Sequence, residues 1–192
     1  MIMNKLLTPL ILVGCGLLLV TAARAQDTNA PRTYLDSFEA SYGVVIVRGS
    51  ADIGTVTTAT GTVSVRCKES VEPRSGRKQH GLAVTLTGKD RQSDTTIIDY
   101  DELDSLLSGL DFLSTANWSL TTLPSFDAVY TTRDGFQAAA YSSQKNPGTL
   151  AVSLKSGRTV KVRVPLAPQD LAQFRELIHQ AKVKLDALHA AQ

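Results

Sequence analysis

The order of apolar and polar residues up to about residue 100 predicts β-strands. Four segments are rich in Val, Ile, Leu and Thr and are bounded by Gly, Asp or Ser: YGVVIVRG, TGTVSVRCKES, HGLAVTLTG and TTIIDY. In the third segment Leu82, Val84 and Leu86 alternate with Ala or Thr. A period of two places alternate residues on one face of a strand. We therefore predict strands in these segments, and we interpret GSADIG at 49–54 as a turn between strands.

The hydrophobic period changes after residue 100. The segment DELDSLLSGLDFL carries five leucines related by spacings of three and four: Leu103, Leu106, Leu107, Leu110 and Leu113. These spacings place the leucines on one side of an α-helix. Gly109 is a poor helix former and should weaken this helix. We expect a loop at 114–124, which ends at a proline.

Two hairpins and a helix are predicted for the rest of the chain. Asp134-Gly135 is a favoured turn pair between two alternating runs, and a KSGR turn joins GTLAVSL to TVKVRVP. From about Pro168, apolar residues recur at spacings of three and four: Leu171, Phe174, Ile178, Ala181, Leu185 and Leu188. This stripe is typical of a helix packed on a sheet, and it is too short for a convincing coiled coil.

These elements together predict the α+β class. Because hairpins imply antiparallel pairing, we expect a mainly antiparallel sheet of about seven to nine strands, one mid-chain helix and a C-terminal amphipathic helix packed on the sheet. We expect one domain at 34–192. Each strand-rich half is followed by a helix, which would fit a remote internal duplication, although the residues themselves show no repeat.

The N-terminus has the pattern of a secretory signal peptide at 1–25. Lys5 precedes an apolar run, and small residues before Gln26 form a cleavage site after Ala25. The run from Leu6 to Val20 has 15 residues and contains a proline and two glycines. A membrane-spanning helix needs about 20 apolar residues. We therefore expect export with removal of the signal, to the periplasm or the outside of the cell.

Lipid anchoring is the alternative to ordinary cleavage. LVGC at 12–15 resembles the lipobox of bacterial lipoproteins, which would leave a lipidated Cys15 as the new N-terminus. Apolar residues follow Cys15, where a polar tether is expected, so cleavage after Ala25 is the preferred interpretation. Residues 26–33 are polar and are expected to form a flexible leader. Cys67 would then be the only cysteine, which excludes an internal disulfide.

The charge balance bears on the expected partners. The chain has 20 Lys and Arg against 18 Asp and Glu, and cleavage removes Lys5 and Arg24, which leaves the two signs equal. A neutral mature chain argues against nucleic acid and against a membrane surface. We therefore expect no nucleic-acid partner, membrane contact only through a lipid on Cys15, and an unknown envelope or extracellular protein or small ligand as partner.

Charges are nevertheless unevenly distributed along the chain. Residues 92–132 contain seven acidic residues and no Lys or Arg, whereas 66–91 and 133–163 are mainly basic. Two interpretations remain open. The acidic and basic segments are either neighbours that complement each other within one fold, or they form a bipolar surface that binds a cation or a partner.

The densest acidic segment is DYDELD at 99–104. It does not fit a calcium loop, because Leu103, Asp104 and Leu110 occupy the fifth, sixth and twelfth positions. Acidic residues are favourable in the first turn of a helix, and we interpret Asp101 as the helix cap with Asp104 as its partner. Asp99 and Asp101 are the best candidates for an acid pair if the protein is a hydrolase.

No other motif indicates catalysis or a cofactor. His80 stands alone, and His179 and His189 lie ten residues apart on opposite faces of the predicted helix, so we expect no metal site. The sequence SGRK fits the S-x-x-K pattern of penicillin-recognising enzymes, but SSQK at 142–145 fits it equally well. No phosphate-binding loop is present. We expect no catalytic, cofactor-binding or metal-ligating residues.

The sequence therefore favours an exported, non-enzymatic binding or structural domain of unknown ligand. Two alternatives remain: an envelope hydrolase with an acid-based site, and a lipid-anchored envelope component.

The first prediction concerns the N-terminus of the mature protein. We expect it to begin at Gln26, because the small residues before that position suit signal cleavage. Intact mass spectrometry of the exported protein measures this directly. The mass of a diacylated chain that begins at Cys15 would contradict the prediction and would establish a lipoprotein.

Overall fold

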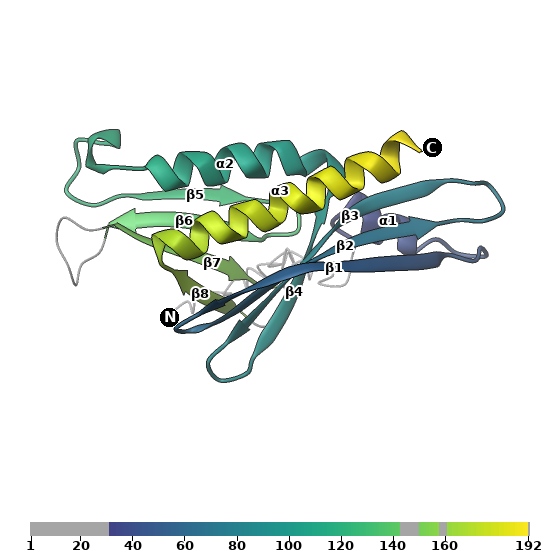
Figure 1. Cartoon of the computed structure of the whole chain (residues 1–192), viewed down its shortest axis with the longest axis horizontal. Coiled ribbons are helices and arrows are strands. Elements are labelled where there is room, and N and C mark those ends of the chain that lie inside the picture. Colours follow the sequence, from purple (N-terminus) through teal and green to yellow (C-terminus); the bar gives the residue numbers. More distant parts are fainter. Residues whose placement is uncertain (1–30, 143–149, 158–160, 192) are drawn as a thin grey trace, which may run out of the picture.

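The computed structural model describes residues 31–142, 150–157 and 161–191. Its strands form two four-stranded antiparallel sheets, in which each strand pairs with its neighbour in sequence (Figure 1). Sheet A contains β1 (Val47–Thr58), β2 (Gly61–Val71), β3 (Lys78–Gly88) and β4 (Ser93–Asp99). Sheet B contains β5 (Asp127–Thr131), β6 (Gln137–Ser142), β7 (Leu150–Ser156) and β8 (Val162–Leu166). The α+β class with antiparallel strands is confirmed.

The helices connect and cover the two sheets. They are α1 (Tyr34–Glu39), α2 (Leu103–Thr115) and α3 (Pro168–Ala190), with short 3-10 turns η1 (Tyr100–Glu102) and η2 (Trp118–Leu120). The mid-chain and C-terminal helices are as predicted, but α1 was not predicted. None of the described helices is long and apolar enough to cross a membrane.

Each long helix packs on the sheet of the other half. Helix α2 follows sheet A but contacts β5 and β6, whereas α3 follows sheet B but lies across β1, β2 and β3 (Figure 1). One hydrophobic core therefore contains residues from both halves, and the rings of Phe136 and Phe174 meet within it at 6.0 Å. The order of four strands and a helix occurs twice, but the two halves interlock instead of folding side by side.

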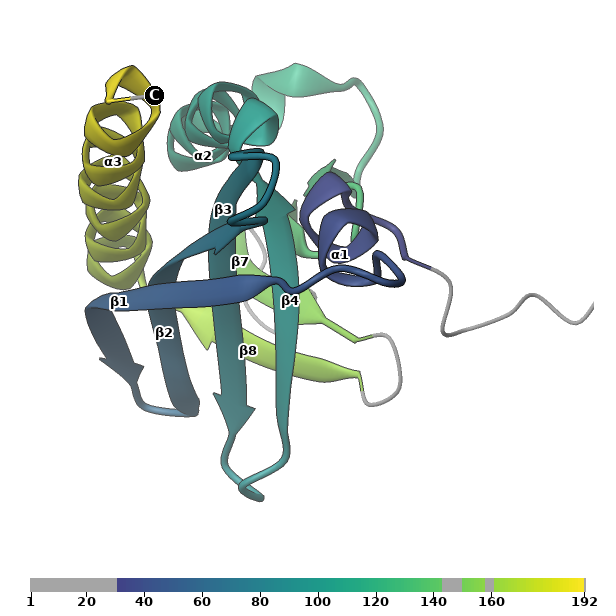
Figure 2. The same cartoon turned by 90° about the vertical axis from the view of Figure 1, so that its right-hand side faces the viewer.

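The alternating residues of sheet A divide its two faces. Val63, Val65 and Cys67 of β2 are buried on the inner face toward α3, where the Cys67 thiol donates to the Ala181 carbonyl oxygen at 3.6 Å. Burial raises the pKa of this thiol to about 11, so it stays protonated at neutral pH. Helix α1 packs on the opposite, outer face, and Figure 2 shows α1 and α3 on opposite sides of the sheet.

Two interpretations of the β1 region were wrong. GSADIG is not a turn, because Ser50 pairs with Lys68 and Asp52 with Arg66 inside the β1–β2 ladder. Its glycines belong to a strand that contains a register shift between Asp52 and Gly54, and such bulges favour residues without side chains. The apolar residues 42–46, expected to begin a strand, precede β1 instead.

Glycines permit the closest helix–sheet contacts. A Cβ at Gly54 would lie 2.7 Å from Leu177 of α3, and one at Gly109 would lie 2.6 Å from the Tyr130 ring of β5. Non-bonded atoms do not approach so closely, so α2 can lie against Tyr130 of β5 only because residue 109 has no side chain.

This contact reverses the effect expected for alanine at residue 109. Helix propensity alone predicts that Gly109→Ala stabilises α2 by about 1 kcal/mol. We expect a net destabilisation of about 1–2 kcal/mol, because overpacking against Tyr130 costs more than the helix gains. Urea unfolding measures the change, with the exposed Ser108→Ala as the matched control. A Gly109→Ala protein that is more stable than the wild type would contradict the packing argument.

Candidate functional site

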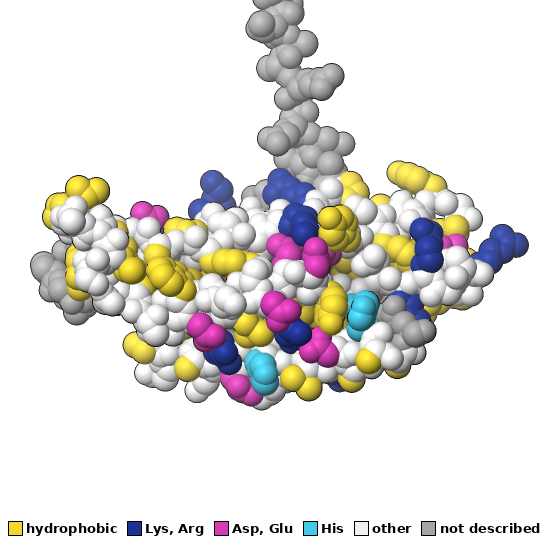
Figure 3. Space-filling view, turned by 90° about the horizontal axis from the view of Figure 1, so that it is seen from above, with side chains coloured by type: hydrophobic (Ala, Val, Ile, Leu, Met, Phe, Trp, Pro, Cys, Tyr) yellow, Lys and Arg dark blue, Asp and Glu magenta, His cyan; other side chains and the backbone are white. Residues whose placement is uncertain are grey.

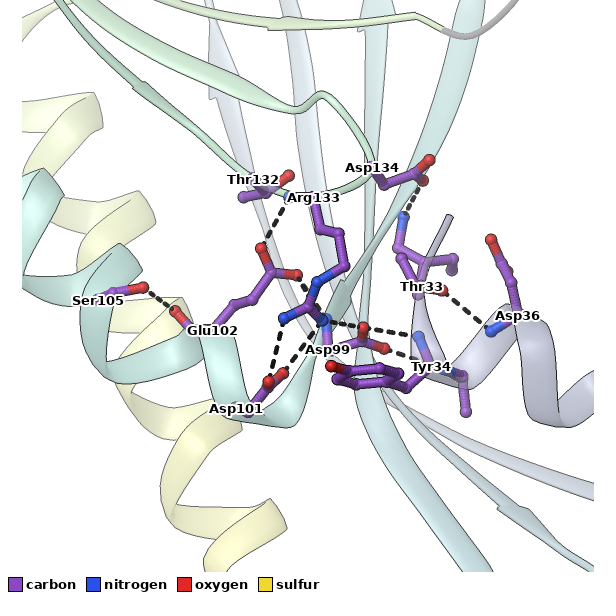
Figure 4. A network of polar contacts seen from close by, with 12 residues as sticks. Thr33, Tyr34, Asp36, Asp99, Asp101, Glu102, Ser105, Thr132, Arg133 and Asp134 are labelled. Atoms are coloured by element: carbon purple, nitrogen blue, oxygen red, sulfur yellow. Dashed lines mark hydrogen bonds and ion pairs between the residues drawn. The ribbon is translucent and has the colours of Figure 1, made fainter. Parts of the chain in front are cut away.

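The acidic segment DYDELD lies at the junction of β4, α1 and the β5–β6 turn. Figure 4 shows three of its carboxylates, those of Asp99, Asp101 and Glu102, gathered around the guanidinium of Arg133. Asp99 ends β4, Asp101 and Glu102 lie in η1, and Arg133 lies in the turn between β5 and β6. We call Asp99, Asp101, Glu102 and Arg133 the junction network.

Asp99 is the buried centre of the junction network, with a side chain only 3% exposed. Its two carboxylate oxygens accept the backbone N–H groups of Tyr34 at 2.8 Å and Leu35 at 3.0 Å. A hydrogen bond and ion pair with Arg133 completes its partners. The first N–H groups of a helix have no partner within the helix. Thr33 is the N-cap residue of α1, since its hydroxyl accepts the N–H of Asp36 at 3.0 Å, and Asp99 adds to this cap from a position distant in sequence.

Arg133 also binds the other two acids of the junction network, Asp101 and Glu102. Its Nη2 donates to Asp101 at 3.0 Å, and its backbone N–H donates to Glu102 at 2.7 Å. The guanidinium lies over the Tyr34 ring, 4.4 Å from the centroid. The hydrogen bond to Asp101, followed by the one to Asp99, raises the pKa of Arg133 above its ordinary value despite partial burial. The guanidinium is therefore a permanent cation that neutralises the acids around it.

The residue after Arg133 extends the junction to the edge of sheet A. The Asp134 carboxylate accepts the backbone N–H of Ile97 at 2.9 Å, so the turn of sheet B closes part of the open edge of β4. Gly135 follows with φ of +88°, and its N–H donates to the Thr132 carbonyl at 2.9 Å. The Asp134-Gly135 turn predicted from the sequence is thus confirmed, and it has a second role that the sequence did not indicate.

The structure corrects the assignment of the helix cap. DYDELD does begin a helical segment, but Asp99 caps the 3-10 turn η1, which leads into α2, and the Asp99 N–H donates to Glu102 at 3.3 Å. Asp101 binds Arg133 instead, and Asp104 extends toward solvent, 3.5 Å from Lys182. Asp99 and Asp101 hold the same cation, so neither has a free oxygen pair directed at a substrate. This arrangement stabilises the junction.

The acidic stretch 92–132 is complemented within the fold. Besides the junction network, Asp111 binds Arg175 at 2.6 Å, and Asp104 lies beside Lys182. Figure 3 shows acidic and basic side chains intermixed on the face that carries α2 and α3. Among residues 31–142, 150–157 and 161–191, no group of three His, Cys, Asp or Glu is placed to hold a metal ion.

Tertiary folding brings together two histidines that the sequence separates. His80 is buried beside Glu69, with 3.2 Å between Nε2 and the carboxylate, and its ring lies 6.0 Å from that of His189. His189 also stacks on Tyr100 at 5.0 Å. This contact attaches the end of α3 to sheet A. Hydrophobic spacing does not predict it, because the crossing angle of α3 decides which turn of the helix reaches β3.

A hollow on the outer face of sheet A is the best candidate for a binding site. It has a volume of about 290 Å³, and we call it the cationic groove after three of its lining residues: Arg48, Arg66 and Lys68. Ala83 and Ile97 supply apolar surface to the same groove. The sequence signal for the groove lies in TGTVSVRCKES, where polar residues alternate with the buried apolar ones and therefore share the outer face of β2.

Two carboxylates accompany the three cations of the groove. Glu39 of α1 lies 2.9 Å from both Arg48 and Lys68 and accepts a hydrogen bond from Ser70 at 2.7 Å. Burial acts to raise the pKa of Glu39, but the bonds from Ser70 and Lys68 outweigh it and keep the pKa below its ordinary value. Arg66 binds Asp52 at 2.7 Å, with 55% and 79% of the two side chains exposed.

Beyond the groove, the outer face of sheet A carries side-chain hydroxyls in two rows across the four strands. The pairing register aligns one row of four residues and then a second: Thr55, Ser64, Thr85 and Thr95, followed by Thr57, Thr62, Thr87 and Ser93. Hydroxyls within the first row bond each other, with Thr55 and Ser64 at 2.9 Å and Thr85 and Thr95 at 2.8 Å. The open face is therefore cationic at one end and neutral and hydroxyl-rich at the other.

Comparisons with known proteins give little further information. No protein-family model matches the chain, and no curated protein sequence matches it. A solved structure of a plant transcriptional regulator, PBF-2, is similar with a TM-score of 0.31 and 13% identity, over 77% of this chain and 86% of that chain. A likeness at this level assigns neither a family nor a function.

The expectation of no nucleic-acid partner does not stand, because the cations clustered in the groove remove its ground; the similar solved structure is also that of a transcriptional regulator. The inference rested on the neutral charge of the mature chain. Net charge is a sum over the whole surface and says nothing about local clusters, such as the three cations of the groove. The exclusion is withdrawn, although the likeness itself does not argue for a nucleic-acid ligand.

The junction network predicts different costs for two neighbouring substitutions. Asp99→Asn should destabilise the protein by about 2–4 kcal/mol, because it leaves buried N–H donors and Arg133 without their shared anion. Asp101→Asn, at a half-exposed position, should cost less than about 1 kcal/mol. Denaturant unfolding of the two variants measures both costs. Equal costs would contradict the central role assigned to Asp99.

Proposed function

We propose that the protein is an exported, non-catalytic domain that binds a negatively charged polymer on the outer face of sheet A. The cationic groove is the observation that supports this proposal most directly. Three basic side chains from β1 and β2 converge on it, and only two carboxylates accompany them. Arg and Lys bind phosphate, sulfate and carboxylate groups through charge-assisted hydrogen bonds.

The existing ion pairs leave these cations available to a ligand. Arg66 and Asp52 are both well exposed, and pairs of this kind contribute little to stability. A ligand anion can therefore share or replace Asp52 at small cost. Glu39 is different, because it is mostly buried and holds Lys68 and Arg48 in place. We assign Glu39 the role of positioning these two cations.

The hydroxyl rows favour an extended ligand over a small one. They continue along the same strands from the groove, so a chain that enters the groove would next meet Ser64 and Thr85. Neighbouring strands lie about 4.8 Å apart, and alternate residues about 7 Å apart. Ser and Thr hydroxyls at these intervals can bond the oxygens of phosphodiester groups or sugars. The shared ligand chemistry is a repeating anion with adjacent oxygen acceptors.

Export remains a proposal based on residues 1–25, which lie outside the described part of the chain. The lipid-anchored alternative at Cys15 also lies outside it. The groove and the hydroxyl rows do not depend on either route.

Binding to two polyanions tests the proposal. We expect the protein to bind heparin or a single-stranded DNA oligonucleotide at low salt, and the two probes distinguish an acidic glycan from a phosphodiester chain. Arg48→Gln with Arg66→Gln should weaken the binding at least about tenfold, and in the DNA arm each substitution should lower the salt slope by about 1. Fluorescence anisotropy at several salt concentrations measures both effects.

Lys155→Gln is the matched control, because it removes one exposed cation from sheet B, away from the groove. It should bind like the wild type. Failure of the wild type to bind either polymer, or an equal loss in the control, would overturn the proposal. Circular dichroism of each variant checks that the fold is intact.

A further inference from the structure

An exposed apolar tip lies at one end of sheet A, next to α1. It consists of 42–47, which lead into β1, and 72–78, which turn from β2 into β3. Tyr42 is 98% exposed and Val45 72% exposed, and Val44 and Val47 beside them are also exposed. Large apolar side chains gathered this closely on a surface usually mark a site of interaction.

The local backbone turns these side chains outward. Gly43 has φ of +73°, a conformation that other residues rarely adopt, and nothing lies within 4 Å of where its Cβ would be. The chain therefore bends away from the sheet before β1 begins at Val47. A hollow of about 540 Å³ separates 43–45 from 72–74. The two segments form a pair of projecting loops at the right-hand end of the molecule in Figure 1.

Basic residues surround the apolar tip. The turn 72–78 contributes Arg74, Arg77 and Lys78 and a single acid, Glu72. Arg77 binds Glu72 at 2.6 Å, and this hydrogen bond, with one from Ser75, keeps the pKa of Glu72 below its ordinary value. Glu72 is thus neutralised within the turn. Arg74 and Lys78 leave the tip with an excess of positive charge.

We propose that the apolar tip inserts into an anionic lipid surface. A membrane interface accepts apolar side chains beneath its headgroups and an aromatic ring such as Tyr42 at headgroup level, while acidic lipids attract the basic fringe. The tip offers all three features on two short loops. This contact requires neither a spanning helix nor a lipid on Cys15, and it is independent of the polymer proposed for the cationic groove.

A second apolar patch provides a comparison within the same molecule. Phe112, Leu120, Leu123 and Val129 are also exposed. All four lie within 92–132, whose acids pair with Arg133, Arg175 and Lys182, so that no excess of positive charge is left there. Anionic lipids should not attract that patch. The two surfaces both expose large apolar side chains, and they differ in the excess of positive charge, which only the apolar tip has.

Vesicle sedimentation of the purified processed protein tests the proposal. The probes are phosphatidylcholine vesicles and vesicles that also contain phosphatidylglycerol. We expect binding to the second kind only, and weaker binding as salt is added. Tyr42→Ser with Val45→Ser should lower partitioning at least about tenfold, since two apolar anchors are lost. Arg74→Gln with Lys78→Gln should remove most of the salt dependence.

Leu123→Ser is the matched control, because it removes an equally exposed apolar residue from the acidic part of the chain. It should partition like the wild type. Three results would overturn the proposal: no preference for the anionic vesicles, an equal loss in Leu123→Ser, or full binding by the Tyr42/Val45 variant. Light scattering completes the test, because a dimer that dissociates in the Tyr42/Val45 variant would show that a second copy covers the tip instead.

Discussion

The carboxylate of Asp99 brings three separate parts of the chain together, and its interaction with Arg133 is the centre of that junction. Asp99 is the last residue of β4 in sheet A, and Arg133 lies in the turn between β5 and β6 of sheet B. The backbone N–H groups of Tyr34 and Leu35 in α1 donate to the carboxylate of Asp99. A buried carboxylate is stable only when its charge is neutralised and its oxygens accept hydrogen bonds. This requirement fixes the position of one sheet relative to the other at the junction.

Helix α1 contacts the junction network, the cationic groove and the turn of the apolar tip. It has six residues, which is too short for a helix to be stable alone. Asp99 caps its first turn, and Glu39 in its last turn holds Arg48 and Lys68 of the cationic groove. Phe38 of the same helix lies beneath Arg77, which neutralises Glu72 in the apolar tip. Loss of the junction should therefore disturb both surfaces together.

The exchange of helices between the two halves decides which faces remain open. Helix α3 covers the inner face of sheet A, so the outer face, with its groove and hydroxyl rows, is left to α1 and solvent among the described residues. Acidic and basic segments separated in sequence then neutralise each other: Asp111 with Arg175, and the junction acids with Arg133. The acidic stretch that first suggested a cation site is thereby mostly internal pairing.

The sequence by itself determined the elements, because hydrophobic period is a local property: the leucines of α2, the stripe of α3 and the Asp134-Gly135 turn follow from spacing alone. It did not reveal α1, whose first N–H groups bind Asp99, 65 residues from Tyr34, or the true role of Gly49 and Gly54 inside β1. Only the tertiary structure decided that Arg133 lies among the carboxylates of the acidic segment, that three cations share one groove, and that residues 42–45 stay exposed. These features depend on which strands pair and how the helices cross them. They are stabilised by contacts between residues far apart in the chain, which the local hydrophobic period does not reveal.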